Sequence, residues 1–470
     1  MKIAMCSSEI VPFAKTGGLG DVCGALPLAL ERIGVEAVLF LPKYRSIEDK
    51  GNAVEKVSSD VSKTTIGKNI DVYFIDNEKY FYRDGLYGDN NGDFHDNLER
   101  FSFFCLKILE TIKNLNIDID VIHCHDWQTA LIPVYLKERF GQCEIFKDIK
   151  TIQTIHNLAF QGIFDRRDFP KLGLRNELFD HGLFEFYGSV NLLKGAIYYA
   201  DQVTTVSKQY AKEIKTREFG FGLEHLLLSK GEKLIGILNG LDYEIWDPQK
   251  DDLINVKYSN ENIDSDKIDN KEWLQKEVGF KCSNEVPVFG LVGRLSHQKG
   301  IDLLTQALDE LMTLDIQVVI QGVGEERYYE KLSRFVERYP QKIAACFEFN
   351  EHLAHQIYAG SDMFLMPSIY EPCGLSQLIA FRYATVPIVY KTGGFIDTVI
   401  PHDNKEGKGN GFIFDKYDRN SFVEIIKVAS EVYKDKQRFH KLVEQAISVC
   451  FSWNKSAEEY KTLYESLKVD

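Results

Sequence analysis

Short apolar runs without polar alternation recur along this chain, and stretches of helical periodicity separate them. Lys2–Cys6 and Val121–Cys124 are such runs in the first half, and Val288–Val292 and Val386–Val389 are such runs in the second. Strands of a parallel sheet lack alternation because helices cover both of its faces. The sequence therefore predicts an α/β fold that is built on parallel sheets.

Two series of these runs indicate two domains, and 470 residues suffice for a full core in each. The segment from Asn239 is turn-rich, and 251–269 is polar and acidic, so this region is predicted to connect the domains. A β-rich insertion is expected to begin near Val54 and to include Ile70–Asp76. The predicted domains are 1–243 and 244–450, and 451–470 is predicted to form a helix that packs back on the first domain.

The formal net charge of −14 disfavours an extended nucleic-acid surface and attraction to anionic lipid. The nine cysteines include no CxxC pair, which indicates reduced thiols and no structural zinc site. No apolar run approaches the roughly 20 residues of a membrane helix, and no signal-peptide pattern opens the chain. We expect a cytoplasmic protein, and the sequence does not predict its oligomeric state.

The stretch KTGGLGD at Lys15–Asp21 follows the first apolar run and precedes a helical pattern, and KTGGF returns at Lys391–Phe395. Two glycines at such a turn are expected to aim free backbone N–H groups and a positive helix end at an anion. Lys15 adds a mobile charge. These features predict a cleft between two such turns, one in each half, that binds a phosphorylated, sugar-like ligand. The alternative is a plain helix start with a solvated lysine.

Arg294 and Lys299 follow the strand Val288–Val292. Ligands bind beyond the carboxyl ends of strands in open parallel sheets, so both cations are predicted to reach that crevice. Arginine can bind phosphate oxygens in a bidentate manner, and the pair suits a diphosphate leaving group, where charge develops during bond cleavage. The alternative is two solvated surface cations.

The sequence Tyr370-Glu371-Pro372-Cys373-Gly374-Leu375 lies where a strand gives way to a helix. Glu371 could accept hydrogen bonds from sugar hydroxyls, while the N–H groups of Cys373, Gly374 and Leu375 face the ligand. Cys373 has no histidine nearby in sequence, so we interpret it as a bystander thiol rather than a nucleophile. The alternative is that Pro372 and Gly374 only begin a helix.

Two further strand ends carry histidines, HCHDW at 123–127 and HN at 156–157. His123 and His125 alternate along a strand and therefore face the same side, but with no third ligand in range we predict no metal site. Buried histidines that pack against a sheet are the alternative.

Together, these residues resemble a known family. The motifs KTGGLGDV, GLYGD at Gly85–Asp89, HDWQ, TIHN, NGLD, GRLSHQKG, EPCGL and KTGG occur in the order found in bacterial glycogen synthases and plant starch synthases. The resemblance covers nearly the whole chain, and the ordered set is specific although each motif is short. It implies the GT-B glycosyltransferase fold of two facing Rossmann-like domains, with the nucleotide held mainly by the second and the glucan acceptor mainly by the first.

The resemblance further implies transfer of glucose from ADP-glucose to the nonreducing-end 4-hydroxyl of an α-1,4-glucan, with retention of configuration and no cofactor or metal. The implied mechanism is front-face attack, in which the leaving diphosphate takes the proton of the acceptor. The catalytic residues carried over by motif are Glu371, Arg294, Lys299, His156 and Asp126. The substrate-binding residues are Lys15, Gly17, Gly18, Asp21, Asn157, Asn239, Tyr358, Cys373, Gly374, Leu375, Thr392, Gly393 and Gly394, with Tyr358 stacked on adenine.

Two positions depart from related patterns. Retaining relatives often carry a second glutamate eight residues after the one that matches Glu371, where this chain has Ile379. This argues against a sucrose- or lipid-directed enzyme and leaves the ribose contact unassigned. His225 stands where the family more often has glycine, which affects no predicted catalytic residue.

Other functions stay open at this point. A UDP-glucose-dependent glucan synthase fits the same residues, because uracil could also stack on a tyrosine. A sugar-nucleotide epimerase of the same fold and a glucan-binding protein with a vestigial site are the alternatives from other classes.

Overall fold

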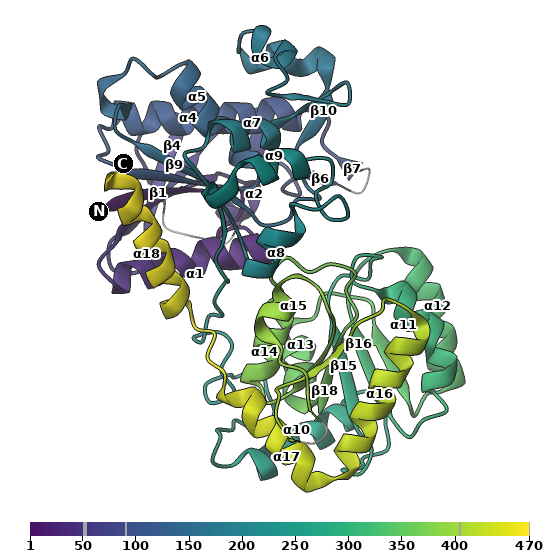
Figure 1. The fold of residues 1–470 in the computed structure, drawn as a ribbon. Helices are drawn as coiled ribbons and strands as arrows, with labels where there is room; N and C mark the ends of the chain where they lie inside the picture. Colours follow the sequence, from purple (N-terminus) through teal and green to yellow (C-terminus); the bar gives the residue numbers. More distant parts are fainter. Residues whose placement is uncertain (50–53, 90–91, 404–405, 470) are drawn as a thin grey trace. The chain divides into compact units, whose positions relative to one another are not determined.

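The computed structural model describes residues 1–49, 54–89, 92–403 and 406–469. Contacts divide the chain into unit 1, Met1–Gly240 with Trp453–Asp470, and unit 2, Leu241–Ser452. Each unit is built on one large sheet (Figure 1). Within the described ranges, every helix is too short or too polar to cross a bilayer.

The sheet of unit 1 is parallel except at one edge, where β3 and β4 run antiparallel. The β-rich insertion predicted to begin near Val54 contributes β3, β4 and β5 to this sheet, and β5 pairs in parallel with β2. In sheet order, the strands are β14 (Leu234–Gly236), β13 (Gln202–Thr205), β9 (Lys150–Ile155), β8 (Val121–His125), β1 (Lys2–Cys6), β2 (Glu36–Pro42), β5 (Ile70–Ile75), β4 (Val61–Ile66) and β3 (Glu55–Lys56).

Helices cover both faces of this sheet, with α1 and the C-terminal α18 together on one face and α4, α5 and α7 on the other (Figure 1). The helices are α1 (Gly18–Arg32), α2 (Arg45–Asp49), α3 (Glu78–Phe81), α4 (Asn97–Asn114), α5 (Leu131–Glu138), α6 (Glu177–Asp180), α7 (Leu192–Tyr199), α8 (Lys208–Glu213), α9 (Glu224–Ser229) and α18 (Trp453–Val469). Two small sheets complete the described part of unit 1: β10 (Ile163–Asp165), β12 (Ser189–Asn191) and β11 (Glu185–Phe186), and the pair β6 (Gly88–Asp89) and β7 (Gly92–Asp93).

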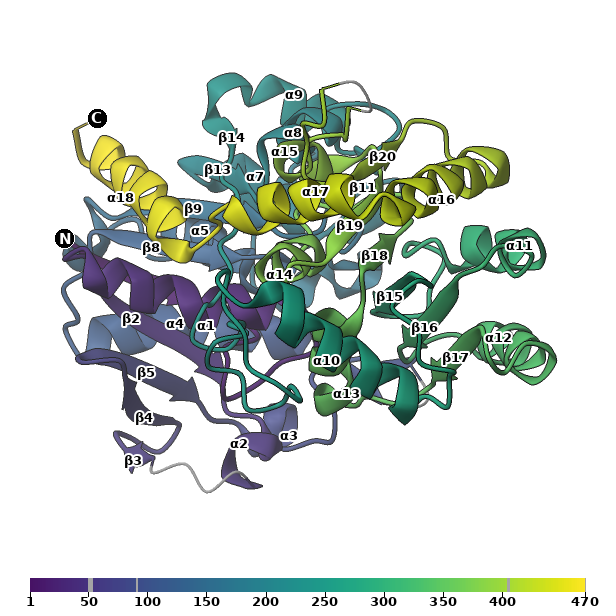
Figure 2. The same cartoon turned by 90° about the horizontal axis from the view of Figure 1, so that it is seen from below.

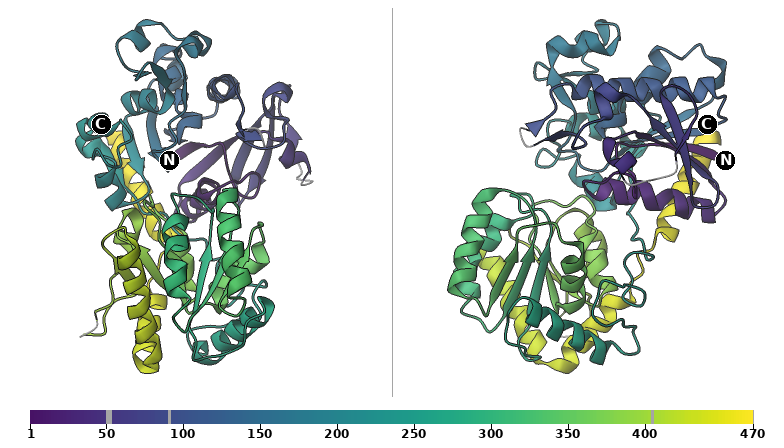
Figure 3. Two further views of the ribbon diagram at one scale, coloured as in Figure 1. Left: turned by 90° about the vertical axis from the view of Figure 1, so that its right-hand side faces the viewer. Right: turned by 180° about the vertical axis from the view of Figure 1, so that it is seen from behind.

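Unit 2 has a fully parallel sheet with apolar, buried strands. α11 and α16 pack together, as do α10 and α13, and the two pairs cover opposite faces (Figures 2 and 3). In sheet order, the strands are β17 (Ile343–Cys346), β16 (Gln317–Gln321), β15 (Val288–Val292), β18 (Met363–Met366), β19 (Val386–Tyr390) and β20 (Phe412–Phe414). The helices are α10 (Ile263–Glu277), α11 (Ile301–Leu311), α12 (Glu326–Arg338), α13 (Glu351–Gly360), α14 (Ser376–Arg382), α15 (Gly393–Thr398), α16 (Arg419–Lys434) and α17 (Lys436–Ser448).

The acidic stretch 251–269 does not connect the two units, contrary to the sequence-based prediction. It belongs to unit 2, where α10 continues it and buries Leu274 and Asn270. The side chain of Asn270 donates to the carbonyl of Val256 at 2.7 Å, and Asp251 is itself buried. The chain instead passes between units at Gly240 and again after Ser452, where the N–H of Leu241 donates to the carbonyl of Phe451 at 2.7 Å.

Candidate active site

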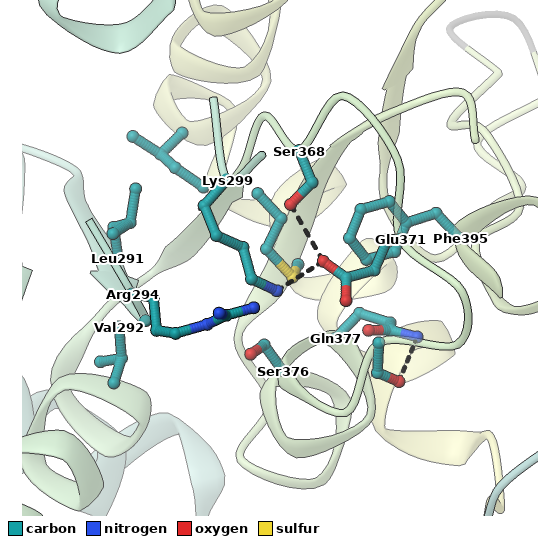
Figure 4. Close-up of a pocket in the computed structure, with 13 residues that line it drawn as sticks. Leu291, Val292, Arg294, Lys299, Ser368, Glu371, Ser376, Gln377 and Phe395 are labelled. Carbon is teal, nitrogen blue, oxygen red and sulfur yellow. Dashed lines mark hydrogen bonds and ion pairs between the residues drawn. The ribbon is translucent and has the colours of Figure 1, made fainter. Parts of the chain in front are cut away.

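A pocket in unit 2 lies at the carboxyl ends of β15 and β18, as expected for an open parallel sheet (Figure 4). Figure 4 shows Arg294 and Lys299 directed toward the carboxylate of Glu371. The pocket is lined by Leu291, Val292, Gly293, Arg294, Lys299, Leu365, Met366, Ser368, Glu371, Gly374, Ser376, Gln377 and Phe395. Three of the five predicted catalytic residues therefore meet in one place.

An ion pair and a hydroxyl fix the carboxylate of Glu371, which is 8% exposed. Nζ of Lys299 lies 2.6 Å from Oε2, and the hydroxyl of Ser368 donates to the same oxygen at 3.0 Å. The guanidinium of Arg294 donates to Oε1 of Gln298 at 3.2 Å. Two cations beside a fixed carboxylate can hold an anionic group and a hydroxyl-bearing group next to each other.

The second KTGG turn packs directly on the backbone of the Glu371 loop. A Cβ on Gly393, whose φ is +44°, would lie 1.9 Å from the carbonyl oxygen of Glu371, and a Cβ on Gly394 would lie 2.0 Å from that of Cys373. The N–H of Gly394 also donates to the carbonyl of Glu371 at 3.0 Å, and Thr392 is buried. This close approach of two backbone segments requires glycine at both positions. The expected ligand contacts of Thr392, Gly393 and Gly394 stay predictions.

The loop after Glu371 begins α14. Cys373 is 5% exposed, and Gly374 has a positive φ of 75°. The amide of Gln377 donates to the carbonyls of Cys373 and Gly374, at 2.9 Å in each case. Sequence reasoning missed Ser368 and Gln377, whose only signal was their position three residues before and six residues after Glu371.

The structure buries Tyr358, and its predicted contact with adenine stays a prediction. Its side chain is 2% exposed, because the ring is stacked on Phe364 with centroids 4.5 Å apart and meets Trp246 edge-on at 5.6 Å. No face of Tyr358 is open to a base.

Sequence reasoning did not single out Phe349, which is 87% exposed in the loop after β17. The carbonyl of the next residue, Asn350, accepts a hydrogen bond from the side chain of Gln321 at the end of β16. An aromatic residue in a polar segment after a strand was the available signal.

In unit 1, the first KTGG turn begins α1, with Gly17 as the N-cap. Its N–H groups are not all free, contrary to the prediction. The buried carboxylate of Glu9 accepts bonds from the N–H groups of Thr16, at 2.5 Å, and Gly17, at 3.1 Å. It also accepts a bond from the hydroxyl of Tyr87 at 2.6 Å. Glu9 therefore orders the turn in the manner of an anion bound at a helix start.

Lys15 is half-exposed, and its Nζ lies 2.6 Å from a carboxylate oxygen of Asp21 on α1. The predicted contacts of Lys15, Gly17, Gly18 and Asp21 with phosphate lie on this exposed side of the turn and stay predictions. The ion pair keeps Lys15 beside the helix start, where it adds positive charge to that of the backbone.

The histidine-bearing strand ends also lie in unit 1. The N–H of His156 donates to Oδ1 of Asp126 at 2.7 Å, and Nδ1 of His125 lies 2.9 Å from Nε2 of His156. The side-chain oxygen of Asn157 accepts a bond from the N–H of Ala159 at 3.0 Å, and Asn239 is 5% exposed. In the part of the chain that the structure describes, no group of three or more His, Cys, Asp or Glu residues could hold a metal ion.

Burial raises the pKa of Asp126 to about 7, although backbone N–H groups of His156 and Asn157 oppose this shift. The folded pKa exceeds the unfolded value, so this group's contribution to stability is present below about pH 4 and is lost as the pH rises through 7. We expect Asp126→Asn, which stays neutral, to be a few kcal/mol more stable than the wild type at pH 8 and not at pH 4. Urea unfolding at both pH values measures this difference, and equal stabilities at pH 8 would contradict it.

Comparison with known proteins adds the following similarities. Residues 2–229 match the family model described as starch synthase catalytic domain, and residues 277–449 match glycosyl transferases group 1. The chain is 43% identical to a protein named glycogen synthase from Thermodesulfovibrio yellowstonii, over 99% of this chain and 98% of that protein. It is 44% identical to one of the same name from Clostridium perfringens, with the same coverage.

Among solved structures, the catalytic domain of starch synthase IV from Arabidopsis thaliana, bound to ADP and acarbose, has a TM-score of 0.89 and 32% identity. The similarity covers 100% of this chain and 99% of that one. Sucrose-phosphate synthase from Thermosynechococcus elongatus has a TM-score of 0.62 at 17% identity, which shows a shared fold alone. Both units are thus those of the GT-B glycosyltransferase fold.

Proposed function

Because the chain belongs to the glycogen synthase family, and so builds a glucan from a nucleotide-sugar donor, we propose that its donor is ADP-glucose. The proposed reaction transfers glucose to the nonreducing-end 4-hydroxyl of an α-1,4-glucan with retention of configuration. ADP bound to the Arabidopsis starch synthase structure supports this choice of nucleotide. The pocket in which Arg294 and Lys299 lie beside the carboxylate of Glu371 is the observation that carries the proposal.

In this proposal, Arg294 and Lys299 stabilise the charge that develops on the diphosphate as its bond to the sugar carbon C1 breaks. The acceptor 4-hydroxyl attacks C1 from the same face, and its proton passes to the departing phosphate oxygen. Lys299 and Ser368 both bind Oε2 of Glu371, and we assign Oε1 to a hydroxyl of the transferred glucose. The proposed reaction requires no cofactor or metal, because two side-chain cations supply the charge that a divalent ion would otherwise provide.

The same proposal assigns roles to residues of unit 1. Lys15, Gly17, Gly18 and Asp21 contact the distal phosphate, and His156, Asp126, Asn157 and Asn239 contact the sugars. Support comes from the positions of these groups at the start of α1 and after the strands β8, β9 and β14. Strand ends and helix starts are where such ligands bind in α/β proteins.

We propose that Phe349, rather than Tyr358, stacks on the base of the donor. Its ring is 87% exposed, and burial of an exposed aromatic ring against a ligand is favourable in free energy. It follows β17, at the carboxyl edge of the same sheet that carries the pocket. Removal of the ring should weaken donor binding and leave bond cleavage intact.

A donor panel tests the proposal, with ADP-, UDP- and GDP-glucose offered with glycogen and labelled glucose incorporation measured. We expect ADP-glucose to have a kcat/KM at least about tenfold above the others, because one base-specific contact provides about that much discrimination.

Phe349→Ala should raise the KM for ADP-glucose about tenfold with little change in kcat.

Tyr198→Ala is the matched control, because Tyr198 is 43% exposed and lies on α7 in unit 1. Its KM for the donor should equal that of the wild type.

In the donor panel, equal use of UDP-glucose would contradict the donor assignment. Epimerised sugar nucleotide without glucan elongation would contradict the reaction itself.

A further inference from the structure

Two neighbouring histidines, His125 on β8 and His156 after β9, are joined ring to ring in unit 1. Nδ1 of His125 lies 2.9 Å from Nε2 of His156, and the ring centroids are 5.2 Å apart. Burial holds the pKa of His125 well below its usual value and lowers the pKa of His156 to about 3. Both rings are therefore neutral at pH 7, so each carries one proton and only one of them can donate in this bond.

The second nitrogen of His125 decides which ring donates. Nε2 of His125 is buried and has no hydrogen-bond partner among the residues that the structure describes. A buried N–H without a partner is rarer and more costly than an unpaired acceptor lone pair. The proton of His125 therefore belongs on Nδ1, from which it is donated to Nε2 of His156. The single proton of His156 then resides on Nδ1.

The surroundings of His125 keep its ring in this position. His123 packs against it with centroids 4.2 Å apart. His123 is held in turn by the hydroxyl of Tyr464 on α18, 2.9 Å from Nδ1, and by the hydroxyl of Thr154, 2.6 Å from Nε2. Each ring nitrogen of His123 therefore has a hydroxyl partner, which fixes the orientation of the ring.

We propose that His125 is a positioning residue that holds His156 in the tautomer protonated on Nδ1. His156 is partly exposed, whereas His125 is fully buried, so Nδ1–H of His156 is the ring group left for a ligand. This group donates and does not accept, which suits an oxygen of the transferred sugar. The ligand part of the inference rests on the proposed glucose transfer, but the tautomer does not.

Long-range proton–nitrogen NMR of the full-length protein labelled with ¹⁵N-histidine tests the tautomer. The signals of His156 are assigned by their loss in His156→Gln. In the wild type we expect Nδ1 of His156 to be protonated and Nε2 to be unprotonated. A wild-type His156 protonated on Nε2 would overturn the inference.

Variants of His125 test the positioning role. In His125→Leu the donor is gone, so His156 should shift toward the Nε2-protonated form, and kcat should fall about 10- to 100-fold with a smaller change in KM. His125→Asn keeps an N–H donor near the place of Nδ1 and should retain the Nδ1-protonated form and most of kcat. An unchanged His156 tautomer in His125→Leu would overturn the role of His125.

Tyr464→Phe is the matched control, because it removes a hydrogen bond to His123 and leaves the bond between His125 and His156 in place. It should change the signals of His123 and leave the tautomer of His156 as in the wild type. A change at His156 as large as that in His125→Leu would overturn the assignment to His125. If the wild type shows Nδ1–H on His156 but transfers no glucose, the tautomer is supported and the proposed function fails.

Discussion

Lys299→Ala should lower kcat for glucose transfer by about 10²- to 10³-fold, or about 3 to 4 kcal/mol of transition-state stabilisation. Lys299 is the cation that lies 2.6 Å from Glu371 within the pocket. Its loss removes charge from the place where the diphosphate departs and leaves a largely buried carboxylate without its cation. Single-turnover kinetics at saturating ADP-glucose measure the effect on the chemical step.

Lys391→Ala provides the matched control in the same unit. Lys391 pairs with Asp415 at 2.9 Å, and the two side chains are 56% and 71% exposed. Such surface pairs contribute little, so kcat should change less than about twofold. A loss as large as that of Lys299→Ala would show that the second KTGG lysine, and not the pocket alone, binds the donor.

Gly393→Ala should destabilise unit 2 by about 3 kcal/mol or more and abolish most activity. The added Cβ would meet the carbonyl oxygen of Glu371 at 1.9 Å, at a backbone φ of +44° that L-residues other than glycine rarely adopt. Either the turn or the Glu371 loop must move, so stability and kcat should fall together. Urea unfolding and glucose incorporation measure the two effects.

Gly17→Ala is the matched control, because Gly17 occupies the same position in the first KTGG turn. Nothing lies within 4 Å of a Cβ built there, and its φ of −159° is extended backbone that any residue adopts. The free energy of unfolding should change by no more than about 1 kcal/mol, the cost of alanine at a helix N-cap. An equal loss in both variants would mean that the two turns have the same structural role.

Most strands of the two large sheets could be predicted from the sequence because buried parallel strands are unbroken apolar runs, whereas the short β14 was not predicted. The structure confirms Val288–Val292 as β15 and places β1 at Lys2–Cys6, as expected. These runs predict the α/β fold. The grouping of Arg294, Lys299 and Glu371 could be predicted because ligands bind at the carboxyl ends of parallel strands.

Other features depend on partners that lie far away in sequence. The 251–269 stretch is acidic on average, and only packing shows that the helix which continues it buries Asn270 and Leu274. Tyr358 lies on α13, and its ring contacts Trp246 and Phe364. Local spacing could not distinguish an aromatic residue of the core from one that faces a ligand.

The first KTGG turn shows the same limit for hydrogen bonds. Its glycines suggested N–H groups free for a phosphate, yet Glu9 accepts the N–H groups of Thr16 and Gly17. The sequence shows a glutamate seven residues before Thr16. It does not show that the chain folds back to bring this carboxylate to the turn. Satisfaction of backbone groups is decided by the folded chain rather than by the motif.

The last helix sets an order in time for the assembly of unit 1. α18 is synthesised after all of unit 2, yet it contributes Trp453, Tyr460 and Tyr464 to the core that the first strands begin. A ribosome must add all of unit 2 between them, which takes roughly 10 to 40 s at ordinary elongation rates. During that interval α18 does not yet pack beside α1, so that face of the nascent sheet lacks its cover. His123 also lacks its partner Tyr464. Unit 1 is thus completed only after unit 2 has been synthesised.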